Sequence, residues 1–193
     1  PVEGRLRVLR EGKGTLFSAV VLWQEGELRL ATQQVFIRPR PGAIAVTHPT
    51  ESLPELDSGV AMPFVRGLTP DFTEHYQMRW IDGGWPASSS DKAEFFGSVR
   101  ANGPSGDVEG LLGLLDAWPS PSLSVLESFA PASSVTWTAH LLTDAPASFG
   151  DQRFGYRYQT VAGAGGSHTC VGHMFDSSGE LVAYSEQLVA VFA

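Results

Sequence analysis

The segment Asp107-Val108-Glu109-Gly110-Leu111-Leu112-Gly113-Leu114-Leu115-Asp116-Ala117-Trp118 decides the fold of this 193-residue chain. Its apolar residues recur at the spacing of one face of an α-helix, namely Val108, Leu111, Leu112, Leu115 and Trp118. Residues 105–107 (Ser-Gly-Asp) predict the N-terminal cap of this helix, and Pro119 and Pro121 predict its end. It is the one convincing helical pattern in the sequence.

Short runs of β-branched and aromatic residues on both sides of this helix predict strands. The expected strands are residues 5–10, 16–23, 28–37, 72–81, 93–100, 135–142, 154–162, 168–175 and 181–192. Turn residues at 24–27 and 176–179 indicate two hairpins. A single helix among many strands predicts the α+β class.

A proline-rich stretch separates the first three strands from the rest. Residues 39–70 carry six prolines and no lasting periodicity, as expected of a linker. We therefore expect a first unit at residues 1–41, a linker at 42–70 and a second unit at 71–193.

Composition excludes several classes of protein. The chain is 42% hydrophobic and 18% charged, which excludes a disordered protein, and no apolar run approaches the length of a membrane span. The formal charge of −8, with no basic run, disfavours nucleic acid as a partner. Cys170 is the single cysteine, so there is no internal disulfide and no cysteine-rich zinc site; it is expected to be a small core residue.

A weak internal repeat relates the two ends of the chain at a constant offset of 153 positions. The matched pairs are Val8 and Val161, Gly12 and Gly165, Gly26-Glu27-Leu28 and Gly179-Glu180-Leu181, and Gln34 and Gln187. Three expected strands and two turns share this offset, which indicates a duplicated supersecondary unit. The first copy would then lack its helix and earlier strands, which we expect to precede Pro1.

Four segments resemble acyl-CoA thioesterases of the type II, double-hotdog group. They are Leu111–Ala117, Ser133–Leu141 (SSVTWTAHL), Ser178–Leu188 (SGELVAYSEQL) and, in the first copy, Val8–Lys13 (VLREGK). The resemblance implies a double hotdog, in which a curved antiparallel sheet wraps around a long helix. The first hotdog would be incomplete at its N-terminal side and the second complete.

The resemblance also implies three residues that hold the attacking water. These are Asp116 at the helix end as the base, Ser134 in place of the more usual threonine, and Gln187 in the last strand. Strand parity places Ser134 and Thr136 on one face, so Thr136 stays an alternative for the hydroxyl. Asp116 lies at the border of the apolar face, where partial desolvation would raise its pKa. Gln34 makes a second site conceivable, but we expect at most one per chain.

The expected activity is hydrolysis of fatty acyl-CoA to fatty acid and CoA by a cytoplasmic homo-oligomer of fatty acid metabolism. No metal is expected, because His168 and His173 fall on opposite strand faces and the other histidines are scattered; no cofactor is expected either. A Gly-x-Ser-x-Gly motif is absent, which disfavours a serine hydrolase of that kind. The alternatives are a non-catalytic acyl-CoA or lipid-binding module and, less favoured, a hydratase or dehydratase, which generally needs a catalytic histidine.

Overall fold

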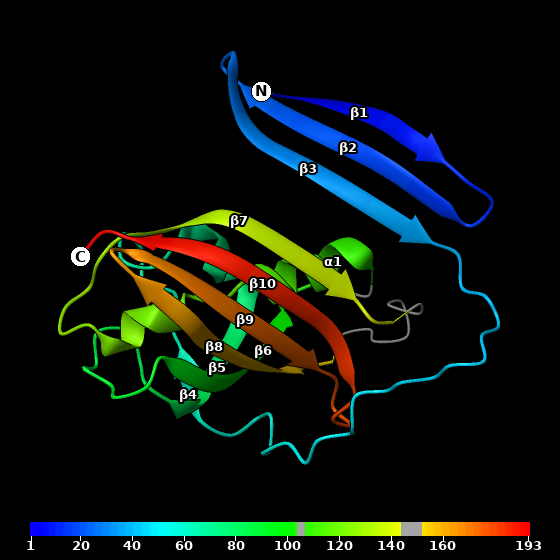
Figure 1. The fold of residues 1–193 in the computed structure, drawn as a ribbon. Helices are drawn as coiled ribbons and strands as arrows, with labels where there is room; N and C mark the ends of the chain where they lie inside the picture. The colour runs from blue at the N-terminus through cyan, green and yellow to red at the C-terminus, as the bar shows by residue number, and fades with distance from the viewer. Residues whose placement is uncertain (104–106, 144–151) are drawn as a thin grey trace. The chain divides into compact units, whose positions relative to one another are not determined.

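The computed structural model describes residues 1–103, 107–143 and 152–193 and divides the chain into two compact units, Pro1–Thr47 and His48–Ala193. The first unit is an antiparallel sheet of three strands in the order β1-β2-β3 (Figure 1). Its strands are β1 (Val2–Glu11), β2 (Thr15–Gln24) and β3 (Glu27–Ile37). All three coincide with predicted strands and extend them at their ends.

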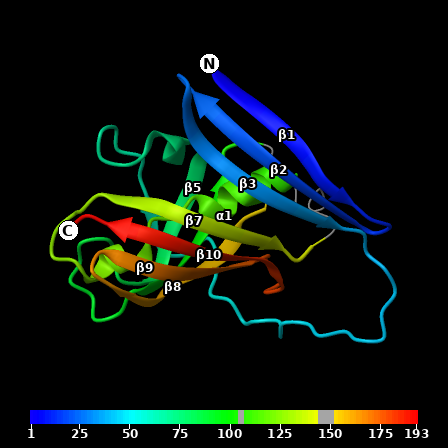
Figure 2. The same cartoon turned by 45° about the horizontal axis from the view of Figure 1, so that its top comes forward.

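The second unit contains a seven-stranded antiparallel sheet in the order β4-β5-β6-β8-β9-β10-β7. Figure 2 shows β8, β9, β10 and β7 of this sheet side by side. The strands are β4 (Val60–Met62), β5 (Tyr76–Gly83), β6 (Glu94–Ala101), β7 (Ala132–Leu141), β8 (Phe154–Ala164), β9 (Ser167–Phe175) and β10 (Leu181–Val191). Six of these match predicted strands, and β4 is an additional short strand.

One α-helix, α1 (Val108–Asp116), occurs in the described parts of the chain, with two short 3-10 helices, η1 (Asp71–His75) and η2 (Pro121–Val125). Asp107 caps α1 as expected, since its carboxylate accepts a 2.7 Å hydrogen bond from the Gly110 N–H. Ser105 and Gly106 of the predicted cap lie outside the described residues. At nine residues the helix is shorter than expected and ends before Trp118, because Pro119 disfavours helical geometry in the residue before it.

The strand expected at residues 72–81 begins only at Tyr76. The Thr73 backbone N–H and hydroxyl both donate to the Pro70 carbonyl, at 3.0 and 2.7 Å, and fold residues 71–75 into η1. This part of the prediction is wrong because side chain–backbone bonding at Thr73 outweighs the alternating pattern.

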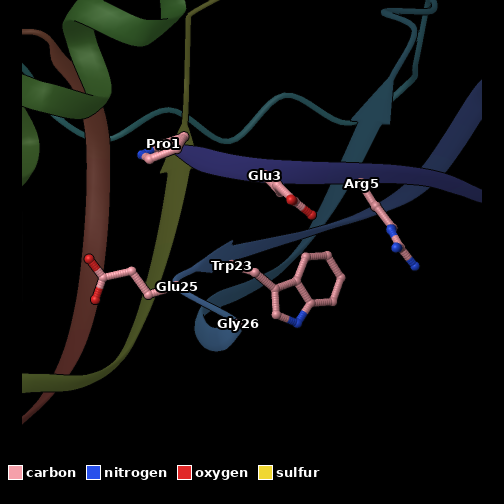
Figure 3. Close-up of a pocket in the computed structure, with 6 residues that line it drawn as sticks. All are labelled: Pro1, Glu3, Arg5, Trp23, Glu25 and Gly26. Atoms are coloured by element: carbon pink, nitrogen blue, oxygen red, sulfur yellow. The ribbon is translucent and has the colours of Figure 1, made fainter.

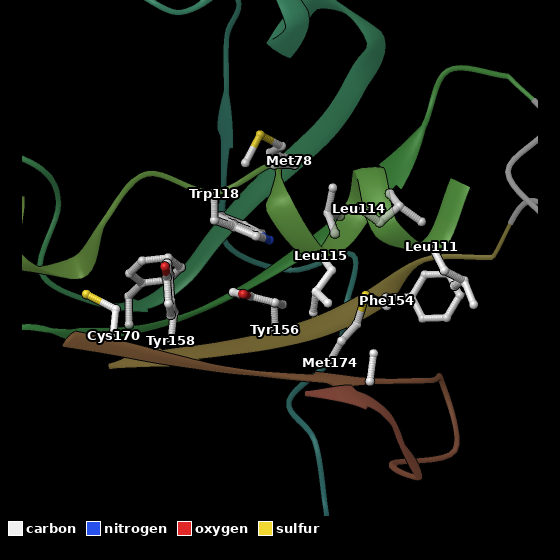
Figure 4. Close-up of a cluster of buried hydrophobic side chains, with 14 of the residues drawn as sticks. Met78, Leu111, Leu114, Leu115, Trp118, Phe154, Tyr156, Tyr158, Cys170 and Met174 are labelled. Atoms are coloured by element: carbon white, nitrogen blue, oxygen red, sulfur yellow. The ribbon is translucent and has the colours of Figure 1, made fainter. Parts of the chain in front are cut away.

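The core lies between α1 and the inner face of the sheet (Figure 4). The helix contacts β6 and β10 and buries Leu111, Leu114 and Leu115. Leu112, expected on the buried face, is only partly buried. Large buried side chains of the sheet belong to the same core cluster as these leucines: Met78, Trp80, Phe95, Val99, Phe154, Tyr156, Tyr158 and Met174. This packing fixes the end of α1 against the sheet.

The repeat is visible in the strands. Adding 153 places β1, β2 and β3 on β8, β9 and β10 to within about two residues at each end. Both hairpins turn on a glycine of positive φ, 79° at Gly26 and 85° at Gly179. Both also carry one unpaired residue in the strand after that turn, Arg29 and Val182, which stand 153 positions apart. The first unit therefore reproduces the last three strands of the second.

Part of the segment expected to be a linker packs on the second unit. The boundary between the two units therefore falls after Thr47, inside that segment. The Glu51 N–H donates to the Gly179 carbonyl at 3.0 Å, and the Ser98 hydroxyl donates to the Leu56 carbonyl. Asp57 pairs with Arg153 at 3.0 Å. These isolated contacts need no periodic sequence, which explains why the segment looks unstructured in sequence.

Candidate active site

Asp116 is the last residue of α1, and its carboxylate lies beside the sheet. The side chain is accessible to solvent, yet the surrounding protein removes enough water that desolvation raises its pKa above the ordinary 3.8. A hydrogen bond from Gln187 acts in the opposite direction and is the smaller effect. A carboxylate of raised pKa is a better proton acceptor than a fully solvated one.

Gln187 of β10 connects the candidate residues. Its side chain is buried, with 8% exposed, and its amide Nε2 donates to Asp116 Oδ1 at 3.3 Å and to Ser134 Oγ at 2.5 Å. Its amide oxygen accepts from the Tyr158 hydroxyl. The structure thus brings together Asp116, Ser134 and Gln187. In the sequence, Gln187 lies 71 positions after Asp116 and 53 positions after Ser134.

The hydroxyl that Gln187 contacts belongs to Ser134 and not to Thr136, because β7 contains a bulge. Leu188 of β10 pairs with Thr136 and Val189 pairs with Ser134, so Val135 has no partner in β10. An extra residue of this kind reverses the alternation of side chains. The expectation that Ser134 and Thr136 share a face is therefore wrong, since only Ser134 turns to Gln187.

Sequence reasoning missed two buried tyrosines of β8: Tyr158, which belongs to this polar cluster, and Tyr156, which lies beside it. Tyr158 donates to Gln187, and the Tyr156 hydroxyl lies 3.3 Å from Ser185 Oγ. Gly172 of the intervening strand β9 makes room, since a Cβ there would lie 2.1 Å from the Tyr156 hydroxyl. Tyr156 and Tyr158 stand two positions apart in a strand, which predicts that both side chains lie on the same face of the sheet. Because a buried tyrosine hydroxyl needs a hydrogen-bond partner, the sequence pattern could have indicated both residues.

In the first unit, Gln34 occupies the position that the repeat pairs with Gln187. Its amide oxygen accepts from Ser18 Oγ at 2.8 Å, and its amide nitrogen donates to the Thr32 hydroxyl. Both ends of this amide are therefore satisfied within β2 and β3. Like Gln187, Gln34 contacts two hydroxyls, but these contacts of Gln34 include no carboxylate corresponding to Asp116.

A separate hollow lies in the first unit and contains none of the predicted site residues (Figure 3). Six residues line it: Pro1, Glu3, Arg5, Trp23, Glu25 and Gly26. The Arg5 guanidinium stands 5.2 Å from the Trp23 ring centroid. A cation over an indole is a common surface contact and does not define a chemistry.

Other reactive side chains take structural positions. Cys170 is fully buried, with its Sγ 3.4 Å from Ser120 Oγ. His173 packs against His48 and Tyr184, at centroid distances of 6.4 and 5.3 Å. Within residues 1–103, 107–143 and 152–193, no group of three or more His, Cys, Asp or Glu side chains could hold a metal. In the same residues no helix has the length and hydropathy to cross a membrane.

Solved structures of similar fold show which fold this chain adopts. A hotdog-fold protein of unknown function from Alicyclobacillus acidocaldarius superposes with a TM-score of 0.86 at 20% identity, covering 98% of this chain and 72% of its own. Acyl-CoA thioesterase II TesB2 from Mycobacterium marinum superposes with a TM-score of 0.69 at 18% identity, and the match covers 99% of this chain and 73% of that protein. The tesB protein of Mycobacterium avium subsp. paratuberculosis superposes with a TM-score of 0.73 at 17% identity, and the match covers 100% of this chain and 72% of that protein. These likenesses confirm the predicted hotdog fold.

The sequence itself identifies the family. Residues 49–191 match the profile of the family described as acyl-CoA thioesterase C-terminal domain. The chain therefore belongs to the acyl-CoA thioesterase family, as its resemblance indicated. A comparison with curated proteins finds no match.

Proposed function

We propose that the second unit hydrolyses acyl-CoA thioesters to a carboxylic acid and CoA. The observation that carries this proposal is the meeting of Asp116, Ser134 and Gln187 at the end of α1. Membership of the acyl-CoA thioesterase family supplies the substrate class. A carboxylate of raised pKa, a hydroxyl and an amide are the groups that a water-activating site requires.

In the proposed reaction a water molecule lies against Asp116 and Ser134. Asp116 accepts a proton as the water oxygen forms a bond to the thioester carbonyl carbon. The tetrahedral oxyanion then collapses, the carbon–sulfur bond breaks, and CoA leaves as a thiolate that takes up the proton held by Asp116, which restores the carboxylate. Gln187 keeps the carboxylate and the hydroxyl in position, because its single amide nitrogen donates to both.

The less buried side of α1, which ends at Asp116, offers a place for the acyl chain. Val108, Leu112 and Asp116 are four residues apart and share one side of the helix. Val108 is 40% exposed and Leu112 only partly buried, so an apolar stripe leads to the candidate base. Each methylene covered on such a stripe contributes about 0.8 kcal/mol of binding. We infer that the substrate is a fatty acyl thioester lying along this stripe.

The test is free-thiol release from a panel of acyl-CoA chain lengths by wild type, Asp116→Asn and Asp107→Asn. Asp107 is the matched control, because it lies at the other end of the same helix and asparagine still caps a helix. We expect wild type and Asp107→Asn to turn over substrate equally, and Asp116→Asn to lose about 10²–10⁴-fold in kcat. Equal turnover by Asp116→Asn would refute the assignment of the base.

The second candidate, a non-catalytic acyl-CoA or lipid-binding module, is separated by the same panel. Binding of acyl-CoA by wild type without any thiol release would leave only that function. The hydratase alternative is less favoured, because the hydrogen-bond partner of Asp116 in the described structure is a glutamine.

We further propose that the chain forms a homo-oligomer through β7. This strand lies at one edge of the seven-stranded sheet, and its Val135 is 57% exposed. Edge strands present unpaired backbone groups that readily bond another strand. Light scattering coupled to size exclusion would measure the mass, and a monomer at micromolar concentration would contradict the proposal.

A further inference from the structure

The amide of Gln187 can lie in the site in two orientations that differ by a half-turn. Its nitrogen and oxygen have nearly the same size, so shape alone does not select between them. Only one orientation directs a donor to Asp116, which as a carboxylate can only accept. The reverse orientation would place the amide oxygen against the carboxylate oxygen. Something in the core must therefore hold the amide oxygen.

We propose that Tyr158 is a positioning residue that fixes Gln187 and, through it, the Asp116 carboxylate. Its hydroxyl donates to the Gln187 amide oxygen, on the side of the amide away from Asp116. The expected effect of Tyr158 on turnover rests on the proposed function. The positioning itself follows from the hydrogen bonds.

The surroundings of Tyr158 suit a fixed donor. Its side chain is 2% exposed, and its ring packs edge-on against Phe95 and Tyr156, at centroid distances of 5.8 and 5.4 Å. Burial raises the pKa of its phenol above the ordinary 10.0, so the hydroxyl keeps its proton at neutral pH. The fixed ring holds the hydroxyl oxygen in one position, from which its proton reaches the Gln187 amide oxygen.

Removing this hydroxyl has a directional consequence. In Tyr158→Phe the Gln187 amide oxygen is left buried without a donor, which is costly enough to turn or displace the side chain. Asp116 then loses the hydrogen bond from Gln187, which lowers its pKa in the native protein. The pKa of Asp116 must therefore rise in this variant. A merely structural role for Tyr158 predicts no such rise.

Tyr156 provides the matched control. It lies two residues away on the same face of β8 and is 1% exposed, and its hydroxyl contacts Ser185 instead of Gln187. Tyr156→Phe removes an equally buried hydroxyl and leaves the Gln187 contacts in place. Both substitutions keep the aromatic ring, so the packing of the core is retained.

The experiment is titration of the Asp116 carboxyl carbon by NMR in wild type, Tyr158→Phe and Tyr156→Phe, with Asp116→Asn to assign the signal. We expect a higher midpoint in Tyr158→Phe and an unchanged midpoint in Tyr156→Phe. Gln187→Leu, which removes the donor itself, sets the largest rise that loss of this hydrogen bond produces. An unchanged midpoint in Tyr158→Phe, or an equal rise in Tyr156→Phe, would overturn the proposal.

Thiol release by the same proteins separates this proposal from the proposed function. We expect kcat to fall about tenfold in Tyr158→Phe, which corresponds to the loss of one hydrogen bond. In the Gln187→Leu background the further loss should be negligible, since Tyr158 acts through Gln187. A wild type that does not hydrolyse acyl-CoA overturns the proposed function, while the titration still decides the role of Tyr158.

Discussion

Replacing Gly172 by alanine tests the packing of Tyr156 against β9. An added Cβ would lie 2.1 Å from the Tyr156 hydroxyl oxygen and 2.9 Å from Ser185 Oγ. Van der Waals contact needs about 3.5 Å, so the tyrosine must move by more than an ångström. It cannot do so freely, because its ring stacks on Trp118 at an interplanar angle of 10°.

The cost of Gly172→Ala follows from two contributions. Overpacking a dense core costs about 1–3 kcal/mol. Separating the Tyr156 and Ser185 hydroxyls in the core costs about 1–3 kcal/mol more. Together these predict a loss of about 2–6 kcal/mol in the free energy of unfolding, or about 6–18 °C in Tm for a unit of this size.

Thermal unfolding followed by near-UV circular dichroism measures this loss. Gly103→Ala is the control, because an added Cβ at Gly103 meets nothing within 4 Å. Tyr156→Phe in the Gly172→Ala background removes the clashing oxygen and should recover part of the Tm. A Gly172→Ala protein that melts with wild type, or a double variant without recovery, would refute the packing described here.

Three further predictions concern stability. Asp116→Asn should raise Tm at neutral pH, because the pKa of Asp116 is higher in the folded than in the unfolded protein and the fold therefore disfavours the ionised carboxylate. Thermal melts at a series of pH values should show this gain vanishing below about pH 4, where the carboxyl is protonated in both states. Glu51→Gln should cost at most about 1 kcal/mol at pH 7, because Arg157 lowers the pKa of Glu51; denaturant titrations should show this loss disappearing as pH falls below that lowered pKa. Leu114→Ala should cost about 2–5 kcal/mol in the same titrations, because Leu114 is fully buried between α1 and the sheet; a cost below 1 kcal/mol would contradict that placement.

Much of the fold could be predicted from sequence because its signals are local. The leucine spacing predicts α1, and Pro119 predicts its end. Alternating runs predict nine of the ten strands. The offset between Gly26 and Gly179 predicts the repeated hairpin, because both positions need the positive φ that glycine adopts readily.

The rest could not be predicted because it depends on the backbone or on distant contacts. The bulge at Val135 decides which hydroxyl meets Gln187, yet no residue type marks it. Tyr158 reaches Gln187 across β9, which requires knowing the order of the strands. The packing of Glu51 and Leu56 on the second unit uses single hydrogen bonds that leave no periodic pattern.

The most direct test of the central claim is the pH dependence of kcat/KM for one acyl-CoA substrate, since this ratio reports the ionisation of the free protein. Asp116 must be ionised to accept the proton, and desolvation raises its pKa above 3.8. We predict that kcat/KM rises with pH through a midpoint above that value, and that this rise is absent from the residual activity of Asp116→Asn. An activity independent of pH over this range, or the same rise in Asp116→Asn, would contradict the account.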